Sequence, residues 1–398
     1  MMRRGDRPRE GSLAAHLAAA FLNGAVSGAS WNAHSRRTAR QVEVLVDWPR
    51  VRQVAHLVAR RSGAARLDQP TRQAWEAEYR DIIARVSLPL LRYLGLGANP
   101  AFHFETAPEV VGRLDWIDVN LVTFRGMFQP VDALAAERLR GHISQPLNQQ
   151  ASSLMLGLVL GYLSGRVLGQ YDPSLLVSQA LPPGKLFLLQ PNLEAAQHDL
   201  GVPARQFFTW IVFHELTHAW QFEAHPWLRN YMSSQVDQLL ASTSGRLIET
   251  DAAELLRLAM RGDISPRQPQ RLVAALMTAD QLDTFTRLQA VMCLVEGFSN
   301  HVMDVLGPEM LPDYAHISHA FEGRDRKRGS AEKLFVRLTG LELKMEQYKA
   351  GERFVDAVVA AHGIAAMNRA WEGPANLPHL REIYHPQLWL DRVLSSGT

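Results

Sequence analysis

The feature that most constrains this chain is an H-E-x-x-H motif inside the apolar segment from Thr209 to Trp227. His214 and His218 are four residues apart, so on a helix both imidazoles lie on one face, one turn apart. Two neutral imidazoles placed in this way can chelate one zinc ion. Glu215 points about 100° away around the helix. It is therefore poorly placed as a third ligand but well placed to act as a general base on a water at the metal.

The residues around the motif predict a long buried helix. Pro203 suits a first helical turn and Pro226 stops the continuation, which predicts a helix from about Ala204 to Ala224. Apolar and aromatic residues occupy nearly all of its sides, which is typical of a buried helix. Burying imidazoles and a carboxylate without partners costs roughly 1 to 3 kcal/mol per polar group. A metal satisfies these groups directly, and hydrogen bonds inside a core are the alternative explanation.

A catalytic zinc site needs a third protein ligand and an open position for water. His225 is the nearest candidate, but the seven residues after His218 rise about 10 Å, too far to share an ion unless the helix ends early. The metzincin pattern is also excluded, because Gln221 and Ala224 stand where it requires Gly and His. The third ligand is therefore expected outside this segment.

Glu296 is the favoured third ligand, because it interrupts an otherwise apolar helical segment from Phe285 to Leu306. An acid at such a position is out of place in a core unless it is paired or binds a metal. Glu223 points to the flank of the first helix. Other acids after Pro226 are alternatives that a solvated helix face also explains: Asp237, Glu249, Asp251 and Glu254.

The motif followed by a Glu on a second helix resembles the gluzincin arrangement of thermolysin-like metallopeptidases. The segments PNLEAAQHDLGVPARQFFTWIVFHELTHAWQFEAHPWLRNYM, VEGFSNHVMD, LTGLELKMEQYKAGERFV and WEGPANLP more closely resemble a bacterial family of zincin-like metalloproteases that is labelled as associated with deazaflavin coenzyme biosynthesis. The resemblance runs from about Trp31 to the C-terminus. It implies a zincin-like fold, one Zn²⁺ per chain, His214, His218 and Glu296 as metal ligands, and Glu215 as the base.

The chain departs from the thermolysin-like pattern in two ways. The separation from His218 to Glu296 is 296 − 218 = 78 residues, so intervening helices must fold back to bring the acid to the metal. Asn300 occupies the place of an acid that orients a zinc histidine, and its amide oxygen could accept the same imidazole N–H.

Hydrolysis also needs a donor for the developing oxyanion, which zincins usually recruit from the second lobe. The sequence offers several candidates without choosing among them: Tyr231, His301, Tyr314, His316 and His319. His301 lies about 140° around the helix from Glu296, so it need not face the metal.

The expected architecture is mainly α-helical with a small β-sheet, in a zincin-like fold of two lobes around an active-site cleft. We expect residues 1–30 to form an N-terminal tail and first helix, and 31–398 a single catalytic domain, with lobe one at about 31–225 and lobe two at about 226–398. The patterns WPRVRQVAHLVARR and WEAEYRDIIARVSLPLLRYL predict helices, and Trp116, Asn120 and Phe124 predict another from near Asp115.

Two apolar segments lie before the motif. Ala151 to Gly165 carries glycines at 157, 161 and 165 and predicts a buried helix packed closely through them. Its length is too short to cross about 30 Å of hydrocarbon, so no membrane span is expected. Lys185 to Gln190 is the clearest strand, and we expect it to present the edge to which an extended peptide substrate adds.

Composition narrows the remaining choices. The net charge of +2 gives no argument for nucleic-acid binding, and the lone Cys293 excludes an internal disulfide and is compatible with a reducing compartment. We therefore expect a cytoplasmic protein. Cys293 falls one turn before Glu296 on the same face, and a role as a small buried hydrophobe is favoured over a ligand.

The sequence favours a zinc-dependent hydrolase, in particular a metallopeptidase that cleaves peptide or amide bonds with zinc-activated water and Glu215 as general base. One alternative is a catalytically silent metal-binding or interaction protein of zincin fold. Another is a metal-free helical protein with a fortuitous motif.

Overall fold

The computed structural model describes residues 46–64, 66–97, 102–138, 145–171, 184–249, 278–326 and 341–395. The tail and first helix predicted over residues 1–30 lie outside these ranges, and so do Asp251 and Glu254. Glu249 ends a described helix, but its side chain is also outside the description.

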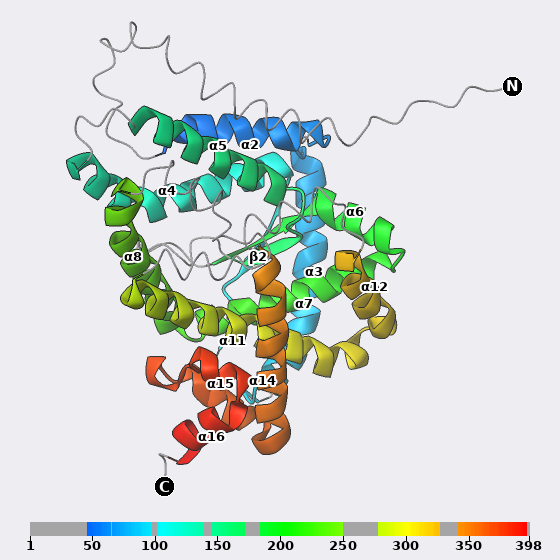
Figure 1. The fold of residues 1–398 in the computed structure, drawn as a ribbon. Helices are drawn as coiled ribbons and strands as arrows, with labels where there is room; N and C mark the ends of the chain where they lie inside the picture. Colours follow the sequence, from blue (N-terminus) through cyan, green and yellow to red (C-terminus); the bar gives the residue numbers. More distant parts are fainter. Residues whose placement is uncertain are drawn as a thin grey trace, which may run out of the picture.

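Helices make up most of the described chain and three short strands form one sheet, which confirms the mainly α-helical class with a small sheet (Figure 1). The elements before the H-E-x-x-H helix are α2 (Trp48–Arg61), α3 (Gln69–Tyr93), β1 (Ala107–Val111), α4 (Arg113–Arg138), α5 (Gln145–Leu163), β2 (Gly169–Tyr171), β3 (Lys185–Leu189) and α6 (Gln190–Leu200). The others are α7 (Ala204–Glu223), α8 (Pro226–Glu249), α11 (Ala279–Met310), α12 (Tyr314–Arg326), α14 (Leu341–Asn368), η5 (Arg369–Trp371), η6 (Pro374–Asn376), α15 (Leu380–Tyr384) and α16 (Pro386–Leu394).

The sheet has the strand order β1-β3-β2, with β1 parallel and β2 antiparallel to β3. The strand predicted from Lys185 is confirmed, but the prediction that it presents a free edge is wrong. β3 is the central strand and pairs on both sides. Its four apolar residues from Leu186 to Leu189 are all buried, as expected for a strand covered on both faces. Among the described strands, β1 and β2 are the two edge strands of the sheet.

Alternate residues of β3 enter two separate hydrophobic clusters because successive strand side chains point to opposite faces. Leu186 and Leu188 join the larger cluster, which contains α3, α7, α11 and α14. Phe187 and Leu189 join the smaller one, which contains α2, α4 and α5. Figure 1 shows the second set of helices on one side of the sheet and α7 and α11 on the other. The larger cluster draws residues from both sides of position 225, and the two-lobe division stays a prediction.

The H-E-x-x-H helix α7 packs against strands β2 and β3. It spans Ala204–Glu223 and follows Pro203, which agrees with the predicted start and end. Thirteen of its residues are buried, in agreement with the predicted buried helix, because α3, α8, α11, β2 and β3 all pack around it. Pro226 stands at the first position of α8, so one helix follows the other after a single break at residues 224 and 225.

The glycine-spaced helix α5 packs closely through two of its glycines, as the sequence predicts, and the structure shows that its partner is α2. A Cβ atom added to Gly157 would lie 2.7 Å from Val54 Cβ, and one on Gly161 would lie 2.6 Å from Val58 Cβ. Gly165 follows the helix and does not take part in this contact. The helix is buried on its glycine face only, since Met155 is 59% exposed on another face. No helix of the described chain is long and apolar enough to cross a membrane.

Candidate metal centre

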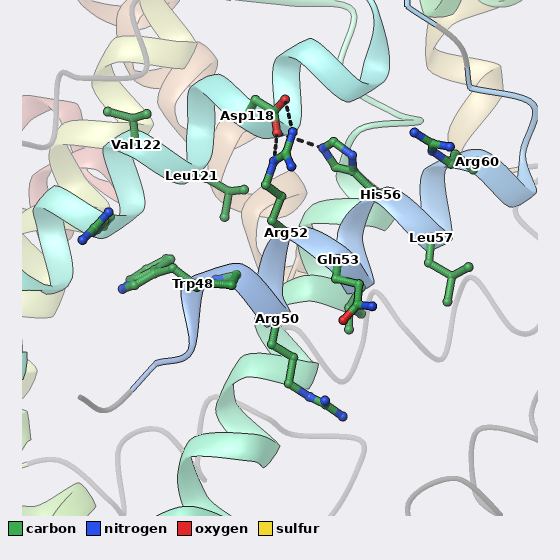
Figure 2. A pocket seen from close by; sticks show the side chains of 13 residues that line it. Trp48, Arg50, Arg52, Gln53, His56, Leu57, Arg60, Asp118, Leu121 and Val122 are labelled. Carbon is green, nitrogen blue, oxygen red and sulfur yellow. Dashed lines mark hydrogen bonds and ion pairs between the residues drawn. The ribbon is translucent and has the colours of Figure 1, made fainter. Parts of the chain in front are cut away.

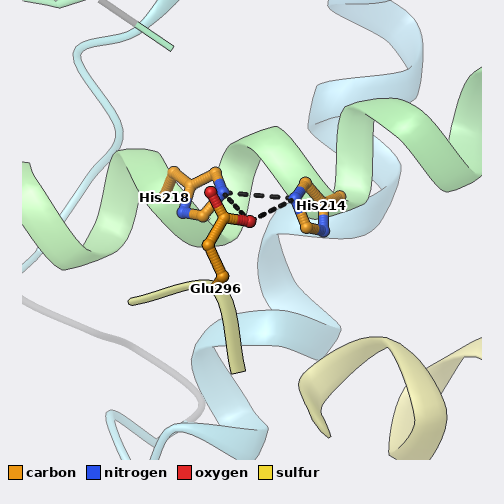
Figure 3. Close-up of side chains that lie close together, drawn as sticks. All are labelled: His214, His218 and Glu296. Carbon is orange, nitrogen blue, oxygen red and sulfur yellow. Dashed lines mark hydrogen bonds and ion pairs between the residues drawn. The ribbon is translucent and has the colours of Figure 1, made fainter. Parts of the chain in front are cut away.

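The structure brings His214, His218 and Glu296 together, and their side chains point toward one another (Figure 3). The Nε2 atoms of the two histidines are 3.2 Å apart, and each is 3.7 Å from Oε2 of Glu296. Within the described ranges this is the one group of three such side chains whose ligand atoms lie within 4.8 Å of one another.

Helix geometry and one helix crossing account for this group. The four-residue spacing on α7 stacks the two imidazoles, and α11 packs across α7 and supplies Glu296. α11 is a long helix, and a capping box at Thr278 and Gln281 defines its start. Its residue Gly297 lies directly against the backbone of α14 at Gly351. The contacts of α11 with α7 and α14 therefore fix where Glu296 lies.

The three ligand atoms have the chemistry and the spacing of a zinc site. Zinc binds His nitrogen and carboxylate oxygen at about 2.0 to 2.2 Å in tetrahedral geometry, which places neighbouring ligand atoms about 3.3 Å apart. The observed separations of 3.2 and 3.7 Å are close to this value. The side chains of His214 and Glu296 are 24% and 23% exposed, and His218 is 11% exposed. The group is therefore more accessible to solvent at His214 and Glu296 than at His218.

Glu215 lies against strand β2. Its Oε2 accepts a hydrogen bond of 2.9 Å from the backbone N–H of Tyr171, and its Oε1 lies 3.0 Å from where a Cβ on Gly169 would be. Burial raises the pKa of Glu215 to about 7, and the charge of Glu296 adds to this, while His218 and the Tyr171 N–H oppose it. A carboxyl with a pKa near neutrality is suited to accept and return a proton.

Glu223, at the end of α7, joins the same strand to the helix. It accepts hydrogen bonds from the backbone N–H of Glu105, from the Thr106 hydroxyl and from the Tyr171 hydroxyl. Burial raises the pKa of its carboxyl, although these hydrogen bonds oppose the change. Glu223 therefore connects the end of α7 to β2 and to the segment before β1, which is a structural role. Tyr171 contacts two acids of α7, one through its N–H and one through its hydroxyl.

Two residues that the sequence reasoning missed contact the far nitrogen of His218. Its Nδ1 lies 2.9 Å from Oε1 of Gln221 and 3.2 Å from Oγ of Ser299. The sequence predicts Asn300 for this role, but its side-chain amide instead donates a hydrogen bond of 3.0 Å to Glu352. The contact of Gln221 could have been predicted from the sequence, because a residue three positions after a helical histidine lies on the same face of the helix.

None of the oxyanion candidates contacts the three candidate metal ligands in the described hydrogen bonds. His301 lies between the Tyr93 hydroxyl at 2.5 Å and Asp356 at 2.6 Å. The Tyr314 hydroxyl donates to Asp304 on α11. Burial raises the pKa of Tyr231, and the charges that act on it are those of Arg287 and Asp283, on the N-terminal part of α11. His316 and His319 are exposed on α12.

The alternative ligands lie elsewhere. His225 is enclosed by Trp220 and stacked on Trp371, and burial lowers the pKa of this histidine to about 4. Asp237 lies on α8 and is not part of the three-residue group. Cys293 is buried, its backbone carbonyl faces Gly351, and burial raises the pKa of its thiol to about 11. These properties fit a small buried hydrophobe.

A surface cavity of about 920 Å³ lies between α2 and α4 (Figure 2). Its lining includes Arg52, His56 and Asp118, which are joined by hydrogen bonds of 2.7 to 3.0 Å. None of the three candidate metal ligands lines it, so it is separate from the candidate centre.

Comparison with known proteins defines the class of this protein. The family model of the zincin-like metallopeptidases matches residues 46–390, and the chain therefore belongs to this family. The family implies a metal ion, and zinc fits the three side chains described above.

A solved structure is similar over most of the chain. The chain is similar to a proposed hydrolase with a novel fold from Chloroflexus aurantiacus, at 32% sequence identity and a TM-score of 0.63, over 89% of this chain and 99% of that one. No curated protein matches the chain at the same level of significance.

Proposed function

We propose that this protein is a zinc-dependent metallopeptidase that cleaves peptide or amide bonds with one zinc ion per chain. The observation that carries the proposal is the convergence of His214, His218 and Glu296 from two helices, with donor separations that suit a tetrahedral zinc ion. Membership of the zincin-like family supports the hydrolase class. The choice of a peptide as substrate rests on the family alone.

Each residue has a defined part in such a reaction. When bound, zinc supplies Lewis-acid polarisation of the scissile carbonyl and lowers the pKa of water. Glu215 would take the proton of the attacking water and return it to the leaving amine, a role that its place beside His214 on α7 suits. The solvent-exposed side of the group, at His214 and Glu296, is where a substrate carbonyl enters.

A second candidate function is a metal-binding or interaction protein of this fold that has lost turnover. One observation favours it: both carboxylate oxygens of Glu215 face β2, where one accepts from the Tyr171 N–H and the other lies beside Gly169. The hydrogen bond from the Tyr171 N–H engages one oxygen of this base, and the oxygen beside Gly169 is left to take a proton from water. Measuring metal content and hydrolysis separately distinguishes the two functions.

Zinc quantitation and hydrolysis of a peptide library test the proposal on the wild type, Glu296→Gln and Glu215→Gln. We expect about one equivalent of zinc in the wild type, severe loss in Glu296→Gln, and retained zinc with abolished hydrolysis in Glu215→Gln, because the base is needed only for turnover. Glu309→Gln, an exposed acid on the same helix α11, is the matched control and keeps both properties.

The outcomes separate the candidates. Zinc in the wild type without hydrolysis of any peptide favours the catalytically silent protein, and a wild type without zinc contradicts both. The association with deazaflavin coenzyme biosynthesis and a cytoplasmic location stay predictions that the side chains of this centre do not address.

A further inference from the structure

The two side chains that contact Nδ1 of His218 also bind one and the same backbone carbonyl. Gln221 Nε2 donates a hydrogen bond of 2.9 Å to the carbonyl oxygen of Val295, and Ser299 Oγ donates one of 3.2 Å to the same oxygen. The same two side chains contact Nδ1 of His218. Gln221 and Ser299 are completely buried and His218 is also buried, so water does not compete for these groups.

Donor and acceptor rules fix the orientation of each group. A carbonyl oxygen only accepts, so the NH₂ of Gln221 must face Val295, and the amide oxygen must face His218. The single hydroxyl hydrogen of Ser299 also goes to Val295, which leaves the lone pairs of Ser299 for His218. Nδ1 of His218 thus meets two acceptors and must carry the hydrogen. In a neutral imidazole the lone pair then lies on Nε2, the atom that faces His214 and Glu296.

We propose that Gln221 and Ser299 are positioning residues that hold His218 in the Nδ1–H tautomer, with the lone pair of Nε2 directed at the metal. This inference rests on the proposed function because it gives Nε2 a metal to bind. The two residues also join the ligand helices: Gln221 comes from α7, whereas Val295 and Ser299 flank Glu296 on α11. One hydrogen-bonded group therefore sets the tautomer of one ligand and the position of the helix that carries another.

The arrangement is uncharged, which distinguishes it from a histidine held by a carboxylate. A carboxylate partner raises the basicity of a ligating imidazole, and partners of this kind tune metal affinity by about 10- to 100-fold. Here the amide and the hydroxyl orient the imidazole without adding a negative charge next to the centre. Glu296 is then the only acid among the ligands.

Zinc affinity and histidine tautomers test this inference together. Gln221→Met keeps the approximate side-chain length but removes the acceptor, and we expect about 10- to 100-fold weaker zinc binding in competition with a chelator. In the metal-free variant, ¹⁵N shifts of His218, assigned with His218→Asn, should move from the Nδ1–H tautomer towards a mixture. Gln235→Met on α8 also replaces a buried glutamine, and as the matched control it leaves both measurements unchanged.

Ser299→Ala is the milder variant and covers the case in which Gln221→Met fails to fold. It removes one of the two acceptors, so we expect a smaller loss of zinc affinity and a partial tautomer change. The inference is overturned if either folded variant keeps zinc affinity within about twofold of the wild type and a pure Nδ1–H signal. If the wild type binds no zinc, the proposed function fails, while the ¹⁵N shifts of His218 still test the tautomer.

Discussion

Two pairs of helices in this protein cross at glycines, and they differ in what the glycines touch. Between α2 and α5, a Cβ on Gly161 would lie 2.6 Å from Val58 Cβ and 2.9 Å from the carbonyl oxygen of Ala55. Between α11 and α14, a Cβ on Gly351 would lie 1.9 Å from the carbonyl oxygen of Cys293, and one on Gly297 would lie 2.2 Å from the carbonyl carbon of Gly351. The second crossing is thus backbone against backbone.

The difference determines what each crossing contributes. The α2–α5 pair lies in the smaller hydrophobic cluster, which contains none of the candidate metal ligands. The α11–α14 pair contains Gly297, the neighbour of Glu296, so its close contact also sets where that ligand lies. Substitutions between α2 and α5 should therefore change only the free energy of unfolding. Substitutions between α11 and α14 should change both the free energy of unfolding and the zinc affinity.

The largest effect is expected from Gly351→Ala. The new Cβ meets a backbone carbonyl that cannot move aside, so α14 must shift from α11. We expect a loss of about 3 kcal/mol in the free energy of unfolding, measured by urea denaturation, although alanine is intrinsically the better helix residue. Zinc affinity should fall as well. Gly373→Ala is the control, since a Cβ there meets nothing within 4 Å; an unchanged denaturation midpoint in Gly351→Ala would contradict the prediction.

A smaller effect is expected from Gly161→Ala. Its nearest obstacle is the side chain of Val58 on α2, and α5 has a partly exposed opposite face, so the two helices can separate slightly. We expect about 1 to 2 kcal/mol of destabilisation by urea denaturation, with zinc affinity equal to that of the wild type. A loss of zinc binding would show that the two helix pairs are coupled and would break the comparison.

The smallest effect concerns Asp118, which joins α4 to α2 at the surface cavity (Figure 2). Burial raises the pKa of this carboxyl, but hydrogen bonds from Arg52, Arg66 and His56 outweigh it and lower the pKa to about 2. The ordinary value is about 3.9. The depressed pKa stabilises the fold fully above about pH 4, and this stabilisation is lost as the pH falls towards 2.

Asp118→Asn tests this contribution. Because the carboxyl is partly exposed to screening solvent, we expect the variant to be less stable by about 1 kcal/mol at pH 7. The difference should shrink between pH 4 and 2, near the pKa of about 2, when urea denaturation is repeated there. A difference that stays constant with pH would mean that packing, not charge, is responsible. Zinc affinity at pH 7 should not change.

Local features of the sequence predicted much of the fold. The bounds of α7, the face shared by its two histidines, the strand at Lys185 and the glycine face of α5 all follow from periodicity or fixed spacing along one element. The central position of β3 and the hydrogen bond from Asn300 to Glu352 were not predictable in this way. They depend on which segments meet, and no spacing within a single element encodes that.

The sequence by itself determined the donor types and the one-turn spacing of His214 and His218, because helix geometry is set by covalent structure and local hydrogen bonds. Only the tertiary structure decided that Glu296 meets this pair across 78 residues, and that Gln221 and Ser299, not Asn300, contact the far nitrogen of His218. The physical reason is the approach of α11 to α7 and α14. It depends on backbone contact at single glycines and on buried donor–acceptor matching, which exist only once distant helices have packed.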